Sequence, residues 1–152
     1  NLNGPTAGQV VGNLTPTFIW SASENARNYS IVVSNDSHLE PVLASASGLE
    51  TLSWTIPAGV LSYNTEYFWG VVAHNNDGET TSTPTSRNFF TPPAPCVGDI
   101  NGDGSTNTAD LTVMLGNFGA SVTPNTNGDF DGDGVVTTSD LTIFLGNFGC
   151  TP

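Results

Sequence analysis

The sequence predicts a multidomain protein with an all-β sandwich at the N-terminus and a small α-helical module of two loop–helix repeats at the C-terminus. Residues 1–91 alternate apolar and polar side chains in short runs between turns, which is typical of a β-sandwich. Residues 96–152 instead contain two related stretches, 99–119 and 129–149, with a period of 30 residues. So short a period in only two copies indicates one duplicated domain rather than a solenoid.

The N-terminal strands are expected where apolar residues recur at every second position. These strands are Gln9–Val11, Thr17–Trp20, Tyr29–Ser34, Pro41–Ala44, Leu52–Thr55, Glu66–His74 and Arg87–Thr91. We expect their buried face to contain Trp20, Ile31, Val32, Val33, Tyr67, Trp69, Val71 and Ala73.

The segment 61–73 reads Leu-Ser-Tyr-Asn-Thr-Glu-Tyr-Phe-Trp-Gly-Val-Val-Ala. Together with the order of the strands, it resembles the fibronectin type III family over about residues 4–91. A Leu upstream of a Tyr marks the tyrosine corner of that family, which implies that the Tyr67 ring is buried and its hydroxyl bonds to backbone. Trp20 matches the family's tryptophan on strand B. An unrelated immunoglobulin-like sandwich would show much of the same pattern and stays an alternative.

The run Thr91-Pro-Pro-Ala-Pro95 marks the domain boundary. Proline fixes φ and favours extended polyproline II backbone, so such a run acts as a short, stiff spacer. We therefore expect a sandwich at 1–91, a linker at 92–95 and the duplicated module at 96–152.

Each repeat opens with a 12-residue stretch rich in Asp, Asn and Gly. Ca²⁺ takes six to eight oxygens, and a 12-residue loop supplies them from positions 1, 3, 5, 7, 9 and 12, with a backbone carbonyl at 7 and Gly at 6. The ligands predicted for two Ca²⁺ are Asp99, Asn101, Asp103, Ser105 (carbonyl), Asn107, Asp110, Asp129, Asp131, Asp133, Val135 (carbonyl), Thr137 and Asp140. The same dipeptides also signal ordinary surface turns. Two copies in register, each followed by the same apolar pattern, favour calcium.

Position 12 of both loops is Asp rather than the usual Glu, so each loop must close more tightly around its ion. A short helix is expected after each loop, at about 108–117 and 138–147. The stretches before the loops contain Pro and Gly and predict no entering helix. The apolar stripes are Leu111, Met114, Leu115 and Phe118, then Leu141, Phe144, Leu145 and Phe148. Because such short helices do not persist alone in water, we expect the two stripes to pack on each other.

A duplicated loop–helix unit (F-hand) with Asp at the last loop position and a 30-residue spacing resembles the type I dockerin family over about residues 97–149. The resemblance implies a two-calcium module that docks onto a cohesin through the face of its helices. Dockerins of this family carry basic residues near the positions that contact the partner. Residues 96–152 contain no Lys or Arg, so the identity of the partner does not transfer.

The formal net charge is −12, from 14 acidic and 2 basic residues, and seven of the acids are the loop aspartates. Two bound Ca²⁺ would bring the net charge to −8. Nucleic acid is excluded as a partner because two basic side chains cannot neutralise a phosphate backbone. The sequence has no run long and apolar enough for membrane insertion. Calcium loops and scarce Lys predict a secreted protein or one at the cell surface.

The two cysteines flank the duplicated module: Cys96 precedes the first loop and Cys150 follows the second helix. A twofold duplication would bring these ends together, so we expect an intramolecular Cys96–Cys150 disulfide. Two free thiols or an intermolecular bridge stay open as alternatives.

No enzymatic activity is expected. No Ser-His-Asp arrangement can be assembled around His38 or His74, because most Asp residues belong to the loops. A zinc site on these two histidines lacks a third ligand, and the scattered glutamates are expected at the surface rather than as a glycosidase pair. The aromatic residues with which sugars could stack are Trp54, Phe68 and one of Phe89 or Phe90.

The expected function is therefore that of a non-catalytic, extracellular, calcium-binding structural or interaction protein. Its favoured mode is head-to-tail self-assembly of copies of the chain into a surface filament. The alternative is docking onto a cohesin-bearing scaffold, with the sandwich as a spacer. A carbohydrate-binding accessory module is the third possibility.

Overall fold

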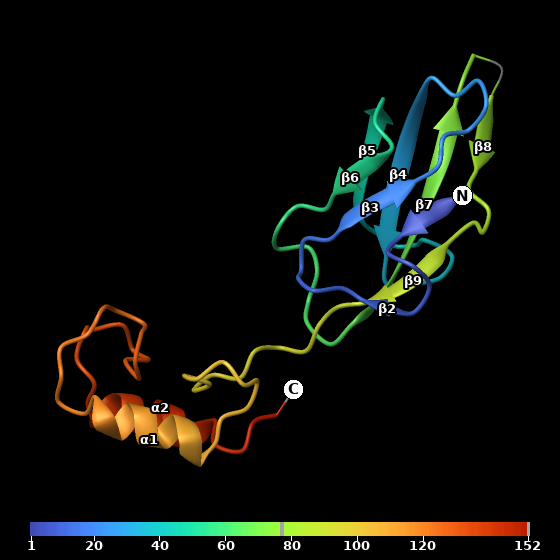
Figure 1. Cartoon of the computed structure of the whole chain (residues 1–152). Helices are drawn as coiled ribbons and strands as arrows, with labels where there is room; N and C mark the ends of the chain where they lie inside the picture. Colours follow the sequence, from blue (N-terminus) through green and yellow to red (C-terminus); the bar gives the residue numbers. More distant parts are fainter. Residues whose placement is uncertain (77, 152) are drawn as a thin grey trace. The chain divides into compact units, whose positions relative to one another are not determined.

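The computed structural model describes residues 1–76 and 78–151, which divide into two compact units, Asn1–Pro93 and Ala94–Pro152. The named strands all lie in the first unit and the two helices in the second (Figure 1). Neither described helix has the length and apolar character needed to cross a bilayer. The backbone N–H of Asn64 donates to the Pro92 carbonyl (3.0 Å), which ties this proline to the sandwich.

The first unit is a sandwich of two sheets. One sheet has the order β1 (Leu2–Gly4), β3 (Thr17–Trp20), β6 (Ser53–Thr55). The other has the order β2 (Gln9–Val10), β9 (Arg87–Phe90), β7 (Glu66–His74), β4 (Asn28–Ser34), β5 (Val42–Leu49), and β8 (Glu79–Thr81) also pairs with β7. The pairings are antiparallel except β2 with β9, which is parallel.

Two strands, β1 and β8, have no counterpart among those expected from the sequence. Strand β8 is Glu-Thr-Thr with every side chain exposed, so it carries no apolar alternation that could reveal it. Strand β5 also continues past Ala44 to Leu49, through small Ala, Ser and Gly residues with little strand propensity of their own. Pairing with β4, rather than local propensity, extends it.

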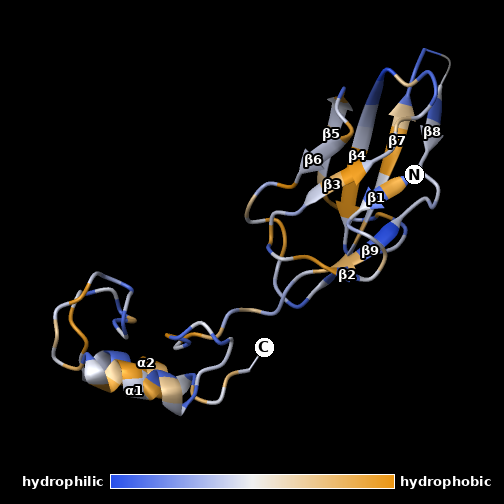
Figure 2. Ribbon diagram, viewed as in Figure 1, coloured by the Kyte–Doolittle hydropathy of each residue, from blue (hydrophilic) through white to orange (hydrophobic). Residues whose placement is uncertain are grey.

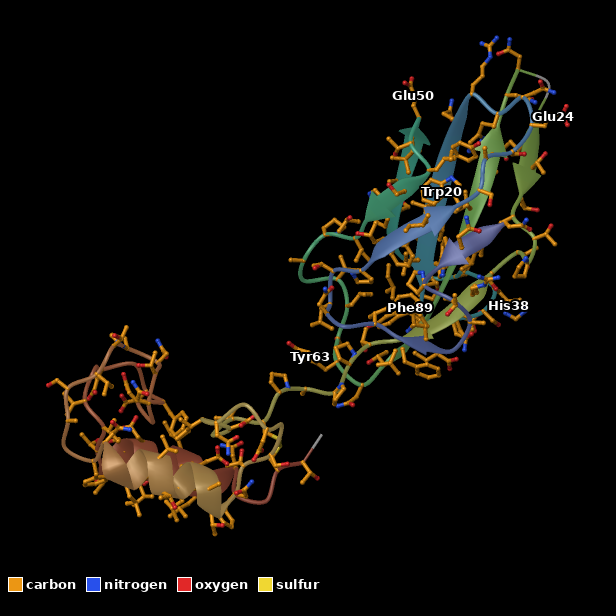
Figure 3. The ribbon with its side chains drawn as sticks, in the orientation of Figure 1. Trp20, Glu24, His38, Glu50, Tyr63 and Phe89 are labelled. Carbon is orange, nitrogen blue, oxygen red and sulfur yellow. A yellow bond between two sulfur atoms is a disulfide. The ribbon has the colours of Figure 1, made fainter. Side chains whose placement is uncertain are left out.

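Aromatic rings form the centre of the sandwich. Phe18 contacts Trp69 (5.1 Å between ring centroids) and Phe89 (5.5 Å), and Figure 3 shows Trp20 and Phe89 between the sheets. The core also contains Leu2, Val11, Tyr29, Ile31, Val33, Ile56, Leu61, Tyr67, Val71 and Ala73. The expectation for Val32 is wrong, because strand alternation turns it away from Ile31 and Val33, and it is only half-buried.

The tyrosine corner forms as expected. Tyr67 is buried, and its hydroxyl accepts a hydrogen bond from the backbone N–H of Ser62 (2.9 Å). Leu61 is buried beside it. The Thr91 hydroxyl donates to the Ser62 carbonyl (2.7 Å), so the residue after β9 is fastened to the same corner.

The second unit contains two nine-residue helices, α1 (Thr108–Gly116) and α2 (Thr138–Gly146). Each begins at a polar cap, Asn107 or Thr137, in a capping box completed by an aspartate at the third helical position. A small core holds the unit together. Its buried residues are Met114, Val136 and Phe144, and Ile100, Leu111, Val122, Phe130 and Leu141 pack against them.

The expectation that the two apolar stripes pack on each other is wrong for half of their members. Met114 and Phe144 are fully buried, but Leu115, Phe118, Leu145 and Phe148 are 53%, 44%, 56% and 46% exposed. Loop residues such as Val136 fill the space that the opposite helix was expected to fill. The remaining apolar side chains therefore face outward, and Figure 2 shows apolar residues along both helices.

Candidate metal centres and exposed helix face

The first aspartate of each loop organises the turn around itself. Asp99 accepts hydrogen bonds from the backbone N–H groups of Gly102 (2.7 Å) and Gly104 (2.8 Å). Asp129 makes the same bonds to Gly132 (2.9 Å) and Gly134 (3.0 Å). These glycines have φ between +77° and +91°, a conformation that side chains with Cβ rarely adopt. The Asp-x-x-Gly-x-Gly pattern thus specifies the turn.

The last aspartate closes the loop onto its helix. Asp110 Oδ1 accepts from the backbone N–H groups of Ile100 (2.9 Å) and Asn101 (3.1 Å), and Oδ2 accepts from Asn107 (3.0 Å). Asp140 repeats all three bonds with the equivalent residues Phe130, Asp131 and Thr137, at 2.7, 3.1 and 2.8 Å. One buried carboxylate thereby caps the helix and holds the start of the loop.

Both closing aspartates are held as anions. Burial alone would raise the pKa of Asp110, yet its backbone N–H donors outweigh burial and leave the pKa below its usual value. The pKa of Asp140 is lowered in the same way against the same effect of burial. A charged carboxylate is the form that a cation requires.

Carboxylates gather in each loop. Oxygens of Asp99, Asp103 and Asp110 all lie within 4.8 Å of one another. Those of Asp129, Asp131 and Asp133 form a second cluster of the same kind. Among the described residues these two clusters are the groups of acidic, His or Cys side chains that could hold a metal.

In the second cluster the neighbouring carboxylates repel one another. The Asp133 backbone N–H lowers the pKa of Asp131, but burial and the neighbouring carboxylates outweigh it, so the pKa of Asp131 is raised. A divalent cation would remove this repulsion. The donors are all hard oxygens without nitrogen or sulfur, which fits Ca²⁺ better than Zn²⁺.

The other predicted ligands lie in the same loops. Asn101 donates to Asp103 Oδ2 (3.0 Å), and the carbonyls of Ser105 and Val135 accept no hydrogen bond from the described residues. The side chains of Asn107 and Thr137 act as helix N-caps, accepting from the N–H groups two residues on. The twelve-residue ligand set stays a prediction.

The two loops are bound crosswise to the opposite repeats, a feature that sequence reasoning missed. Thr106, at position 8 of the first loop, bonds to the segment after α2: its N–H donates to the Cys150 carbonyl (3.0 Å), and its carbonyl accepts from Gly149 (2.8 Å). Val136, at position 8 of the second loop, bonds likewise to Gly119 (2.8 Å) and Ala120 (3.1 Å). Both position-8 residues are fully buried. The signal in the sequence was their side chains, which are β-branched at the same position of both loops.

The expected Cys96–Cys150 disulfide is confirmed. Its Cα atoms are 5.8 Å apart, and the described residues include no free cysteine. It joins residues 54 positions apart and closes the module at the point where Thr106 meets the C-terminal segment.

The outer face of the helices is apolar and uncharged. Leu115 and Phe118 of the first repeat correspond to Leu145 and Phe148 of the second, and all four are exposed. Exposed hydroxyl residues such as Thr112 and Thr142 complete the face. Large apolar side chains exposed at equivalent positions of both repeats make this face a candidate interaction surface. We name it the helix face and define it by these six residues.

The geometry of the second unit agrees with a comparison against protein families, in which the model for the dockerin type I domain matches residues 97–145. These residues are a dockerin type I domain. A solved structure described as the type II cohesin–dockerin domain from Bacteroides cellolosolvens is 37% identical, with 36% of this chain and 85% of that chain covered and a TM-score of 0.33. A comparison with curated proteins found no match.

The N-terminal unit is a fibronectin type III-like β-sandwich, with the β1-β3-β6 and β9-β7-β4-β5 sheets and a tyrosine corner. An Fn3-like protein from Clostridium thermocellum is 22% identical, with 62% of this chain and 91% of that chain covered and a TM-score of 0.46. The structure named FN3tt is 24% identical, with 61% and 94% covered and a TM-score of 0.45. A dockerin module is non-catalytic.

The two histidines have separate partners and form no zinc site among the described residues. His38 Nδ1 contacts Asp36 (2.9 Å) at the surface. His74 Nε2 lies 2.8 Å from the Ser30 hydroxyl, and its Nδ1 lies 3.1 Å from Glu79. The Ser–His–acid order of this second group was not foreseen, because only the register of β4, β7 and β8 brings it together.

The Ser30–His74–Glu79 group is not assigned a catalytic role. It lies on the outer face of the sheet, since the neighbouring Tyr29 and Ile31 point into the core. Backbone N–H groups of these strands are used in strand pairing, so this part of the described sheet offers no oxyanion hole.

The aromatic residues considered for sugar stacking are mostly occupied in packing. Trp54 is half-buried and lies 6.0 Å from Phe18, and Phe68 is also half-buried. Phe89 is fully buried, while Phe90 is the exposed member of that pair. The Trp54 ring therefore packs against the sandwich core.

Proposed function

We propose that this chain is a non-catalytic, secreted assembly protein whose dockerin module binds a cohesin through the helix face. The observation that carries the proposal is the exposed, repeated apolar face of a module that matches the dockerin family. The family match favours this mode over the head-to-tail filament expected from the sequence. The disulfide and the calcium-type loops support an extracellular location.

The helix face supports a largely uncharged interface. Leu115, Phe118 and Leu145 remain exposed although the module has its own buried core. Phe148 is also exposed, although its ring contacts that of the core residue Phe144 (5.8 Å between centroids). Residues 96–152 lack Lys and Arg, so the module supplies no cation to an ion pair across the interface. A partner with an apolar surface ringed by hydrogen-bonding groups fits this face, since such interfaces combine an apolar centre with a polar rim.

Two Ca²⁺ ions are proposed as the resident cofactors, one per loop. Asp99, Asp103 and Asp110 would hold the first, and Asp129, Asp131 and Asp133 the second, with the remaining predicted ligands completing each shell. Each ion would neutralise its carboxylates and fix the loop against its helix. The capping by Asp110 and Asp140 then sets the position of the helices that form the helix face.

The Fn3-like sandwich is proposed as a spacer that carries the dockerin module. Its tyrosine corner fastens the C-terminal end of the sandwich, at Thr91, just before the proline-rich linker. A stiff connection would hold the dockerin away from whatever else the chain binds.

The test is binding of the full chain to purified type I and type II cohesins, by calorimetry in calcium. The double variant Leu115→Ser, Leu145→Ser removes the centre of the helix face without touching the core, and it should abolish binding. Phe90→Ser, an exposed aromatic on the sandwich, is the matched control and should bind as the original chain does. Both variants should keep the original helical circular dichroism.

The same experiment separates the two modes of assembly. Binding to a cohesin that the double variant loses supports docking. Light scattering of the chain alone in calcium reports on self-assembly. If the chain forms large oligomers but binds no cohesin of either type, the filament replaces docking as the function.

A further inference from the structure

Strand β5 ends the larger sheet of the sandwich and leaves one edge of its backbone unpaired. In the order β2-β9-β7-β4-β5 it has a neighbour only on the β4 side. Apart from pairing with β4, no hydrogen bond of the described residues involves the backbone of 42–49. At eight residues, it is one of the longest strands of the sandwich. A row of free N–H and C=O groups of this length is a template for another extended chain.

Two of the usual protections of a free edge, charged side chains and proline, are missing along β5. Proteins blunt such edges with charged side chains or proline within the strand. Residues 42–49 contain neither, and Val42 and Leu43 are 46% and 40% exposed. The remaining residues are small, so the edge is accessible. Its pairing with β4 shifts register near both ends, which leaves 44–46 as the regularly paired middle of the strand. Carboxylates occur only beyond its two ends, at Glu40 and Glu50.

We propose that the β5 edge is a binding site for an extended segment of another protein, with small or β-branched side chains in the middle and Lys or Arg at both ends. Backbone pairing would supply affinity by strand addition, and side chains would supply specificity. Glu40 and Glu50 are exposed, and neither has an ion pair among the described residues, so both are available to basic ends.

The charge pattern decides between this occupant and a second copy of the chain. Two β5 edges paired antiparallel would place Glu40 of one copy towards Glu50 of the other at each end. Like charges directly opposite across strands are destabilising. A basic segment instead meets an opposite charge at both ends. This proposal does not depend on cohesin docking, because it concerns the other domain.

The test uses the full chain in calcium and a fluorescein-labelled peptide of alternating Thr and Val with Lys at both ends. We expect saturable binding by fluorescence anisotropy, and weaker binding of the same peptide with Glu at both ends. The double variant Glu40→Lys, Glu50→Lys should bind the Lys-ended peptide roughly tenfold more weakly than the original chain does. It should also bind the Glu-ended peptide more tightly than the Lys-ended one. Glu24→Lys is the matched control and should change nothing, since Glu24 lies on the β8 side of the sandwich, away from Glu50 (Figure 3).

Backbone pairing is tested separately with Ser45→Pro and Ala46→Pro. Successive N–H groups of a strand point to opposite sides, so one of the two prolines removes a free edge N–H and the other removes a bond to β4. The proline that removes only a free edge N–H should leave the melting temperature of the sandwich unchanged. That variant should no longer bind the peptide. Binding that survives in that variant, equal binding of both peptides, no saturable binding, or dimerisation of the chain through β5 would each overturn the proposal.

Discussion

Thr106 donates its backbone N–H to the carbonyl of Cys150 (3.0 Å), so the first calcium-type loop is closed by the segment that follows the second helix. Val136 of the second loop is closed in the same way by Gly119 and Ala120, after the first helix. Each loop is therefore stabilised by the other repeat. The two closures differ in one respect, because only the first is reinforced by a disulfide.

This asymmetry predicts that the disulfide acts mainly on the first loop. Cys96→Ser with Cys150→Ser should lower the free energy of unfolding of the dockerin module by roughly 2–5 kcal/mol, the usual effect of a bridge over a long loop. Amide hydrogen exchange in calcium should rise more at Thr106 than at Val136. The Thr106 N–H bonds to the disulfide residue Cys150, whereas the Val136 N–H bonds to Ala120. Equal increases at both residues would show that the disulfide stabilises the module as a whole.

The carboxylate clusters predict that the fold of the dockerin module depends on calcium. Asp103→Ala with Asp133→Ala removes one carboxylate from each cluster. We expect loss of helical circular dichroism in calcium, while the sandwich keeps its own thermal transition, because each unit has a separate core. Asp36→Ala, an exposed aspartate of the sandwich, is the control. A double variant that still folds and still responds to calcium would contradict the ligand assignment.

A substitution at Asp131 should raise the stability of the calcium-free module and lower its affinity for calcium. Asp131 sits among like charges that raise its pKa, whereas the first loop has the neutral Asn101 at the same position. Asp131→Asn should therefore raise the melting temperature of the module in chelator, by relieving repulsion, and weaken calcium binding to the second loop. Paired thermal scans and calorimetric calcium titrations measure the two effects. A variant destabilised in chelator would mean that Asp131 is held by favourable contacts in the fold.

The features that were predictable from the sequence are those encoded by local spacing. The tyrosine corner follows from Leu61 and Tyr67 at a short separation, and the loop turns follow from the aspartates and glycines that form them. The strands with clear alternation, such as Thr17–Trp20 and Glu66–His74, form at the expected bounds. In each case the residues that specify the feature are also those that make its contacts.

The features that sequence reasoning missed depend on partners distant in the chain. Which members of a helical stripe are buried is decided by Val136 and other loop residues of the module core, so the exposure of Leu115 and Leu145 was not visible in the pattern. Strand β8 has only polar residues and exists because β7 pairs with it. The proximity of Ser30 to His74 likewise arises from cross-strand register.

Gly70 on β7 gives a test of packing on the outer face of the sandwich. A Cβ at this position would overlap the Thr85 carbonyl oxygen and lie 2.7 Å from Leu39 Cδ1, so only glycine lets these two segments approach the strand. Gly70→Ala should destabilise the sandwich by about 1–3 kcal/mol through overpacking, although its φ is compatible with alanine. Gly12→Ala is the matched control, because its Cβ meets nothing within 4 Å and its φ is also ordinary. Thermal unfolding should show a lower sandwich transition for Gly70→Ala alone, and the dockerin transition should stay in place. Equal melting of both variants would mean that the segments at Leu39 and Thr85 move aside freely and contribute little to the stability of the domain.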